Sequence, residues 1–397
     1  MGYGFKVWTG DKNVPLADDL LEAISEIRIE QELSKATKFA IRFDDDLCSG
    51  KPKAMSSPLL KPGTMIAVLV PDESNPGKDS KPMICLVRGP ITKHKASAVL
   101  GGPASWLEVH GEDRRIEMDR ESKTAKWSGK GPGIVEAILS TYQFDPPAIK
   151  QSDAVSFTDD QSLNQSSSDL KLIDDLCRQL GYEFWFSYTL KGSQIVETPN
   201  FKPSPDFSPA GSTAGGLIGA AAGMLKIDQL TGDNPKTLKL SVADKDCSNL
   251  TAFDLDVDVE KATEALLDGV DAKSGKPQEL KAKSEQPPVD PKAKITPKEF
   301  LGGKVRRFTG AGSTEDRASE AKSILADEAW FVTATASANA YKLPGIVNHH
   351  DLVSVEGAGF MYSGKYQVSK VLHVINGWGH MMDITLRRNS LPGGVHA

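Results

Sequence analysis

The chain has 397 residues, which is enough for about two or three domains of ordinary size. Hydrophobic residues make up 39% of it and charged residues 25%, which is the balance of a globular protein, and the formal net charge is −6. Because nucleic acid attracts basic surfaces, this acidic chain is a poor candidate for binding it, and we expect no nucleic-acid partner.

Membrane targeting is not expected either. The first residues, Met1 to Lys6, lack a basic region followed by an apolar core, so no secretion signal is predicted. The most apolar stretch, Ala214–Leu225, is shorter than the roughly 20 residues that cross a bilayer, and a Gly/Ala-rich connector is favoured over direct membrane anchoring.

The cysteines lie far apart, which favours buried thiols over disulfides: Cys48, Cys85, Cys177 and Cys247.

Residues 1–122 are predicted to be mainly strands. Ile27–Ile29 and Phe39–Phe43 alternate apolar with polar residues, which is typical of half-buried strands. Met65–Val70 and Met83–Val87 are short apolar runs. The polar segment between these two runs is rich in turn-forming residues, so we expect a hairpin there.

Residues 123–205 are predicted to form an α/β unit. Ile134, Val135, Ile138 and Leu139 have the spacing of one helix face. In a second helix Ser168 is suited to cap the start and Gly181 to end it, and an aromatic strand, Tyr182–Tyr188, follows directly. The apolar face predicted for this second helix consists of Leu170, Ile173, Leu176, Cys177 and Leu180.

After the connector, assigned to residues 206–236, strands are predicted again in residues 237–397. Asp271–Pro277 is expected to be a hairpin turn between extended segments. Lys281–Lys298 is rich in Lys and Pro and is expected to be a solvated arm. A helix is predicted from Thr314 to Trp330. The strands predicted around and after these segments are Thr237–Val242, Phe253–Val259, Leu352–Val355, Tyr366–Val371 and Ile384–Leu386.

Two of these strands share a pattern that indicates an internal duplication. Thr37–Asp44 and Thr251–Asp258 both read T-x-F-x-[IL]-x-[FV]-D. A weaker second pair is Gly89–Ile91 and Gly364–Tyr366, where one strand ends at glycine and another begins. The pattern predicts two related β domains with the helical unit between them. Chance similarity between alternating strands is the alternative.

Residues for catalysis, cofactor binding or metal binding do not stand out. Asn348–Asp351 is the one local group of possible metal ligands, but adjacent histidines on a strand point to opposite faces, so a polar turn is favoured. His373 is expected to be packed within a strand. Gly129–Gly133 and Gly310–Thr314 are incomplete phosphate-loop patterns, more simply explained as loops that precede helices. We therefore expect neither an enzyme nor a cofactor.

Several segments, taken in order, resemble the baseplate hub proteins of contractile tails, a family that includes the phage late-control D proteins and the N-terminal hub region of VgrG spike proteins. The resemblance covers nearly the whole chain, and each motif alone is only moderately specific. The segments that carry it are Ser168–Phe186, Asn249–Asp254, Gly269–Pro277, Phe360–His373 and Thr385–Asn389.

The resemblance implies a mainly β chain with an α/β insertion, that is, two tube-protein-like β-barrels that assemble as a trimeric ring. The first barrel would take residues 1–122, and the second, with the arm, 237–397. Such a ring would join a sixfold inner tube to a threefold spike, and would contact other baseplate proteins. The sequence ends at Ala397 without the OB-fold and β-helix of VgrG, so a separate spike protein is expected. The chain would be made in the bacterial cytoplasm and assembled into a phage tail or an injection particle.

Assembly is expected to use unpaired strands at the barrel edges. The residues assigned to these strands are Thr37, Phe39, Phe43, Thr251, Phe253, Gly364, Tyr366 and Val368. The alternative function is a tail-associated glycan-binding or cell-wall hydrolase module. A sugar site needs exposed aromatic rings, whereas Phe184, Trp185 and Phe186 are consecutive, so at least one must be buried.

Overall fold

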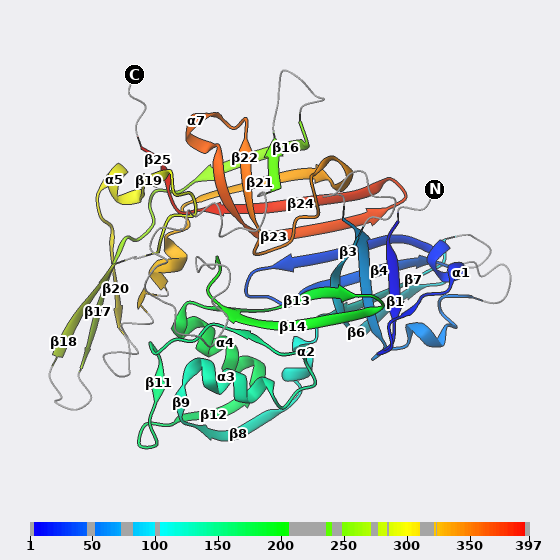
Figure 1. The fold of residues 1–397 in the computed structure, drawn as a ribbon, viewed down its shortest axis with the longest axis horizontal. Coiled ribbons are helices and arrows are strands. Elements are labelled where there is room, and N and C mark those ends of the chain that lie inside the picture. Colours follow the sequence, from blue (N-terminus) through cyan, green and yellow to red (C-terminus); the bar gives the residue numbers. More distant parts are fainter. Residues whose placement is uncertain are drawn as a thin grey trace.

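The protein is mainly β, with few helices. The computed structural model describes residues 4–45, 52–72, 82–99, 104–205, 236–239, 248–270, 277–283, 286–309, 321–322 and 324–393. Its dominant feature is one 13-stranded sheet, in which strands from the two ends of the chain lie side by side (Figure 1).

The N-terminal part of the sheet is built from hairpins. Its elements are β1 (Lys6–Thr9), β2 (Val14–Pro15), α1 (Asp18–Glu22), β3 (Ile24–Glu32), β4 (Lys38–Asp44), η1 (Pro58–Leu60), β5 (Met65–Pro71), β6 (Met83–Ser97) and β7 (Trp106–Glu112). Buried and less buried residues alternate along β4, where Phe39, Ile41 and Phe43 are buried. The alternation predicted for this segment is confirmed, as is the antiparallel pairing of β5 with β6.

The C-terminal part of the sheet consists of β15 (Lys236–Lys239), β16 (Leu250–Val257), β21 (Val332–Asn339), η3 (Ala340–Lys342), β22 (Leu352–Glu356), α7 (Gly359–Tyr362), β23 (Gly364–Asn376) and β24 (Gly379–Arg388). The main strand order is β16-β21-β24-β23-β3-β4-β7-β6-β5-β1-β2. The two parts meet where β3 pairs antiparallel with β23, from Glu26 opposite Asn376 to Glu32 opposite Lys370. We call this pair the seam.

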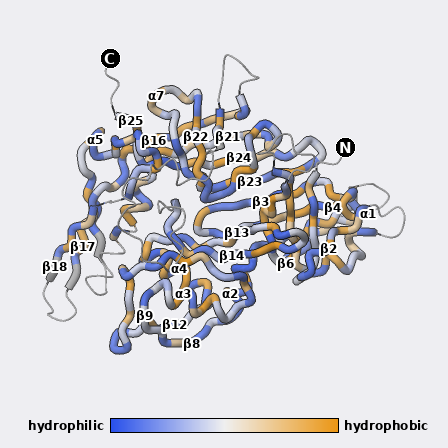
Figure 2. The backbone as a smooth tube through the Cα atoms, viewed as in Figure 1, coloured by the Kyte–Doolittle hydropathy of each residue, from blue (hydrophilic) through white to orange (hydrophobic). Residues whose placement is uncertain are grey.

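The seam changes the expected picture of two separate barrels. The strand path is open, since β16 and β2 lie at its ends, and the described residues form no closed barrel. Instead, side chains from both parts share one apolar core, which includes Ile27, Phe43, Val371 and Ile384. In Figure 2, apolar segments are spread over strands on both sides of the seam.

The α/β unit has a core of its own. Its elements are α2 (Arg115–Met118), β8 (Ser122–Trp127), β9 (Gly129–Lys130), α3 (Gly131–Leu139), β10 (Ala148–Ile149), β11 (Ser156–Phe157), β12 (Leu163–Ser168), α4 (Asp169–Leu180), β13 (Glu183–Lys191) and β14 (Gln194–Lys202). α4 is confirmed in detail: the Ser168 hydroxyl accepts a hydrogen bond from the Lys171 amide, and Gly181 ends the helix at φ 66°. Leu172, which was not assigned to the apolar face, is buried, whereas Leu170 and Leu180 are only partly buried.

A third small unit follows β16 and was not predicted. It contains β17 (Glu264–Val270), β18 (Pro277–Lys283) and β20 (Val305–Thr309), which form a three-stranded sheet, and also β19 (Ala293–Ile295) and α5 (Pro297–Leu301). β17 and β18 pair antiparallel, as expected for the strands that flank the predicted turn, although residues 271–276 lie outside the description. In the region predicted as a helix, residues 321–322 and 324–328 are helical.

The expectation of a solvated arm at 281–298 is wrong. Val289, Asp290 and Ala293 are buried, and β19 pairs with β25 (Leu391–Pro392) near the end of the chain. Because Lys and Pro dominate the composition of this segment, the few residues that pack into the core could not be recognised from the sequence. The 214–225 stretch, Cys48 and Cys247 lie outside the described residues, whereas Cys85 and Cys177 are buried free thiols.

Candidate functional site

The residues expected at barrel edges lie in three different settings. Phe39 and Phe43 are buried residues of β4, and β4 pairs with β3 on one side and with β7 on the other. Thr37, just before β4, is buried and donates its amide to the Asp113 carboxylate at 2.7 Å. The expectation of an edge is therefore wrong here, because an alternating pattern reports one buried face and not the number of neighbouring strands.

β23 is also an interior strand. It pairs with β24 on one side and with β22 and β3 on the other. The Val368 amide donates to the Asp351 carbonyl at 2.9 Å, so a proline at this position would break an internal hydrogen bond rather than a free edge. Tyr366 is fully buried, and its hydroxyl donates to the Tyr362 carbonyl.

β16, which carries Thr251 and Phe253, has the open position. It pairs with β21 on one side, and its other side has no strand partner in the described part of the chain. The Thr251 hydroxyl donates to the Ser337 carbonyl, and Phe253 is partly buried against the core. Since β4 has two neighbouring strands and β16 has one, the two copies of the repeated pattern differ in their surroundings. The internal duplication stays a prediction.

Gly364 lies next to a buried ion pair and not at a free sheet edge. Arg388, which is fully buried, donates to the Asp290 carboxylate at 3.2 Å and to the Ser363 carbonyl. The Gly364 backbone has φ +137°, and a Cβ there would lie 2.3 Å from the Asp290 carboxylate and 3.0 Å from the Arg388 guanidinium. Only glycine lets the strand approach this pair so closely, so Gly364 links β23 to the segment before β19.

The side chain of Gln31 on β3 connects the seam to neighbouring segments through hydrogen bonds. Its side-chain amide donates to the Leu86 carbonyl at 3.1 Å and to the Asn348 side chain at 3.2 Å, and its oxygen accepts from the His349 amide. One buried side chain thus connects β3, β6 and the 348–351 turn.

His349 and His350 lie in a turn and not on a strand, so the argument that their rings point to opposite faces does not hold. Their ring centroids are 4.4 Å apart, and His350 has φ 69°. The His350 ring stacks on Trp185 of the α/β unit with centroids 3.8 Å apart, and its Nδ1 is 2.6 Å from the Ser204 hydroxyl. Both histidines are held neutral, because burial lowers the pKa of His349 to about 3 and that of His350 well below its usual range.

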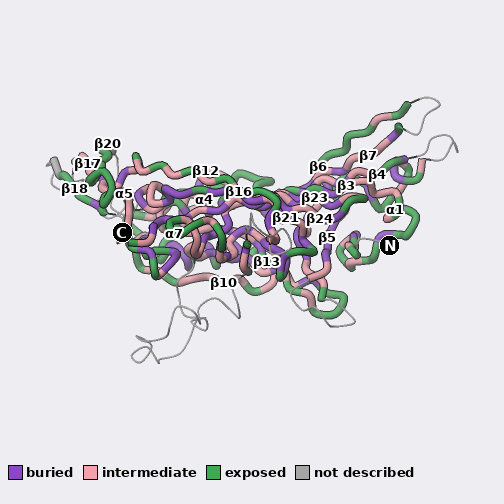
Figure 3. The backbone as a smooth tube through the Cα atoms, turned by 90° about the horizontal axis from the view of Figure 1, so that it is seen from above, coloured by how far each residue is buried: buried purple, intermediate pink, exposed green. Residues whose placement is uncertain are grey.

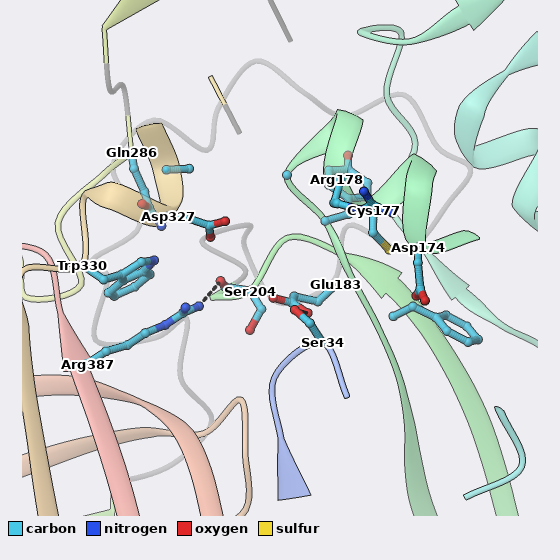
Figure 4. A pocket seen from close by; sticks show the side chains of 14 residues that line it. Ser34, Asp174, Cys177, Arg178, Glu183, Ser204, Gln286, Asp327, Trp330 and Arg387 are labelled. Atoms are coloured by element: carbon cyan, nitrogen blue, oxygen red, sulfur yellow. Dashed lines mark hydrogen bonds between the residues drawn. The ribbon is translucent and has the colours of Figure 1, made fainter. Parts of the chain in front are cut away.

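A cleft of about 390 Å³ lies between α4, the start of β13, β24 and the segment near Trp330, and Ser204, which contacts His350, is among its lining residues (Figure 4). Arg387 stacks on Trp330 with its guanidinium carbon 4.1 Å from the ring centroid, and burial lowers its pKa to about 10. Burial raises the pKa of the Glu183 and Asp327 carboxyls. Arg387 on β24 also donates hydrogen bonds to the Gln367 side chain on β23 and to the Ser204 carbonyl, just after β14. Its contacts therefore connect the α/β unit to β23 and β24 at this cleft.

A second charged contact attaches the α/β unit to β6. Glu197 of β14 is buried and accepts from Arg88 of β6 at 2.9 Å and from Arg114 at 3.1 Å. Burial raises the pKa of Glu197, and the two guanidinium groups oppose that shift. Arg115 adds a link, since it pairs with Asp113 and donates to the Phe184 carbonyl.

These contacts position strands, and the described residues hold no group of three His, Cys, Asp or Glu side chains that could bind a metal. His373 is buried, as expected, and its Nδ1 lies 3.0 Å from Nε2 of His380. None of the helices in the described ranges is long and apolar enough to cross a membrane. Sequence reasoning missed Gln31, Glu197, Asp290 and Arg388, and only the Thr385–Asn389 segment indicated one of them.

Comparison with known proteins gives the fold. No family model and no curated protein matches the sequence. Among solved structures, a tail protein from Neisseria meningitidis matches with a TM-score of 0.60 and 11% identity over 97% of both chains. The 43 kDa tail protein of a Shewanella oneidensis prophage matches with a TM-score of 0.62 and 11% identity, over 96% of this chain and 97% of that one.

A chain of the Francisella PdpA–VgrG complex is also similar, with a TM-score of 0.56 and 7% identity. That match covers 98% of this chain and 59% of the other. The protein therefore shares the fold of phage tail proteins along nearly its whole length.

Proposed function

We propose that the protein is a structural hub in the baseplate of a contractile phage tail or a related injection system. It would form a trimeric adaptor between the sixfold inner tube and a threefold spike made by a separate protein. The observation that carries the proposal is the match to two phage tail proteins over at least 96% of this chain. The segments of the sequence that resemble hub proteins support it independently.

Buried polar contacts between distant segments are consistent with a structural role. Gln31 connects the N-terminal strands to the 348–351 turn, Glu197 connects the α/β unit to β6, and Arg388 connects β24 to the segment before β19. Removing one partner of a buried ion pair costs about 3–5 kcal/mol, and leaving a buried hydrogen-bonding group without its partner costs about 1–3 kcal/mol, so these contacts favour one arrangement of the segments that they join. A rigid subunit transmits force without changing shape, as an adaptor must.

A glycan-binding or cell-wall hydrolase module is the second candidate, and the aromatic strand argues against it. Phe184 and Phe186 are buried, and Trp185 is stacked on His350, so these rings do not form a platform for a sugar. The structural role also needs no catalytic residue. We therefore favour an adaptor without enzymatic activity.

The proposal is tested on the native particle. Particles purified from the producing cells are inventoried by mass spectrometry and imaged by cryo-electron microscopy. We expect the chain to co-purify with tube and spike proteins and to form a ring of three copies between them. Six copies in the ring, a position on outer fibres, or peptidoglycan cleavage by the purified chain would each refute the adaptor.

A further inference from the structure

The cleft between α4, the start of β13 and β24 contains a cation that no carboxylate pairs with in the described part of the chain. This cation is Arg387, whose guanidinium donates to the Gln367 side chain at 2.8 Å and to the Ser204 carbonyl. Both of these partners are neutral. A desolvated cation without an anionic partner is unfavourable, and burial lowers the pKa of Arg387 to about 10. Arg387 is therefore suited to hold an anionic group in the cleft.

Two carboxylates line the same cleft and form no ion pair with a described residue. Glu183 lies across Ser204 from Arg387 in Figure 4, and it accepts a hydrogen bond from the Ser34 hydroxyl at 2.7 Å. Asp327, which is exposed, also points toward this space in Figure 4. Burial raises the pKa of both carboxyls. Because desolvation disfavours the two ionised carboxylates, a cationic group beside them would be favourable.

Acceptors in the lining outnumber the cations that are not already paired. Asp174 is a third carboxylate, and Arg178, the other basic residue of the lining, pairs with Asp175. The side-chain oxygen of Gln286 is buried and has no hydrogen-bond partner among the described residues. A ligand that matches these groups carries one anionic group and more than one cationic N–H donor.

We propose that the cleft binds a free basic α-amino acid of the size of lysine. The α-carboxylate pairs with Arg387, the α-ammonium group pairs with Glu183, and the side-chain ammonium group reaches Asp327 and the Gln286 oxygen. Hydrogen bonds between a guanidinium and a carboxylate, or between an ammonium group and a carboxylate, are charge-assisted and therefore strong. Arg387, Glu183 and Asp327 each gain a partner of opposite charge in this arrangement.

The size and the walls of the cleft suit such a molecule. Its volume of about 390 Å³ falls in the range of small-molecule sites, which is about 300–1,000 Å³. In Figure 3, buried and intermediate residues predominate along α4 and β24, which form two of the walls. Low exposure to water strengthens charge interactions. A metal ion fits less well, because the described residues contain no group of three His, Cys, Asp or Glu side chains that could bind one.

Isothermal titration calorimetry of the full-length chain with L-lysine tests the site, and three analogues each remove one charge. L-Norleucine lacks the side-chain ammonium group, Nα-acetyl-L-lysine lacks the α-ammonium group, and L-lysine methyl ester lacks the carboxylate. We expect each analogue to bind at least about tenfold more weakly than lysine, because each loses a hydrogen bond between charged groups. The acetylated and esterified analogues imitate lysine at the two ends of a peptide, so they distinguish a free amino acid from a peptide.

Two isosteric substitutions assign the charges of the ligand to residues of the cleft. Asp327→Asn should weaken lysine binding by at least about tenfold and abolish the preference for lysine over norleucine. Glu183→Gln should weaken lysine binding to a similar extent and abolish the preference for lysine over Nα-acetyl-lysine. A general loss of packing would instead weaken the binding of all these ligands and leave both preferences in place.

The matched control is Asp159→Asn, which removes an exposed carboxylate of the α/β unit outside the cleft and should bind lysine like the wild type. Thermal unfolding followed by circular dichroism reports whether each variant is folded, and lysine should raise the midpoint of the wild type. No binding at about 10 mM lysine, equal affinities for lysine and norleucine, or unchanged preferences in both variants would overturn the proposal. The hub role is tested separately, because the composition of the native particle does not depend on what this cleft binds.

Discussion

At the residue scale, charged side chains join segments that lie far apart in the sequence. Arg388 reaches Asp290, and Arg88 with Arg114 surrounds Glu197. A buried ion pair of this kind adds little net stability, because removing its charges from water offsets most of the attraction. The cost appears when the pair is disturbed, which makes the residues that accommodate it sensitive to substitution.

Gly364→Ala is expected to destabilise the protein by about 3 kcal/mol or more, from left-handed backbone strain and displacement of the buried ion pair. The new Cβ would lie 2.3 Å from the Asp290 carboxylate. Gly377→Ala, in the β23–β24 turn, is the control, since no atom lies within 4 Å of its added Cβ, and it should change stability by less than about 0.5 kcal/mol. Urea unfolding measures both, and equal midpoints would contradict the role of Gly364.

The pKa of His349 makes stability depend on pH. It falls from 6.5 to about 3 on folding, so between these values the unfolded chain binds a proton that the folded chain does not. Stability contributed by neutral His349 is complete above pH 6.5 and is lost as pH falls toward 3, by up to about 1.4 kcal/mol per pH unit.

This pH dependence is measured as a difference between two proteins. Raised pKa values at Glu183 and Glu197 act in the opposite direction, and they are common to the wild type and His349→Leu. The free energy of unfolding of the wild type should fall relative to that of His349→Leu as pH decreases from 6.5 to 4. A difference that does not vary with pH would show that His349 titrates normally in the folded state.

At the element scale, α4 is the segment whose structure follows most directly from local sequence. The Ser168 cap, the Gly181 end and the apolar spacing all concern residues within four positions of one another, so no distant contact is needed to specify them. The same does not hold for β4, β16 and β23. Their alternating patterns predict strands, but which strand lies at an edge depends on pairing between distant segments.

Leu176→Ala in α4 should cost about 2–5 kcal/mol, because Leu176 is fully buried and its truncation leaves a cavity. Leu176→Asp should prevent the α/β unit from folding, since a carboxylate would be buried among apolar side chains. Lys171→Ala, on the exposed side of the same helix, should have an effect below about 0.5 kcal/mol. Denaturant unfolding checks all three, and a Leu176→Asp protein as stable as the wild type would be inconsistent with this packing.

At the scale of the whole molecule, the seam makes one folding unit of strands from both ends of the chain. Ile29 of β3 and Val371 of β23 are both buried in the core that the two parts share. Ile29→Ala and Val371→Ala should therefore lower the midpoint of the same calorimetric transition, with Ile29→Ala costing about 2–5 kcal/mol. Two transitions, each shifted by only one of the substitutions, would show that the N-terminal and C-terminal parts unfold independently.

The sequence by itself determined the local elements and the class of the fold. Alternating apolar residues identified β4, capping residues identified α4, and the order of the segments that resemble hub proteins agreed with a tail-protein fold. Each of these signals lies within a short stretch of chain, where the spacing of side chains follows from the geometry of a helix or a strand.

Only the tertiary structure decided how the elements join. The seam, the packing of the 281–298 segment and the ion pair of Arg388 with Asp290 depend on contacts between residues about 100 or more positions apart, and no local spacing encodes such contacts. For the same reason the sequence assigned edges to β4 and β23, whereas pairing left the free edges at β16 and the second half of β6. A strand's neighbours are set by the whole sheet, so the sequence could not separate β16, which has one neighbouring strand, from β4 and β23, which lie inside the sheet.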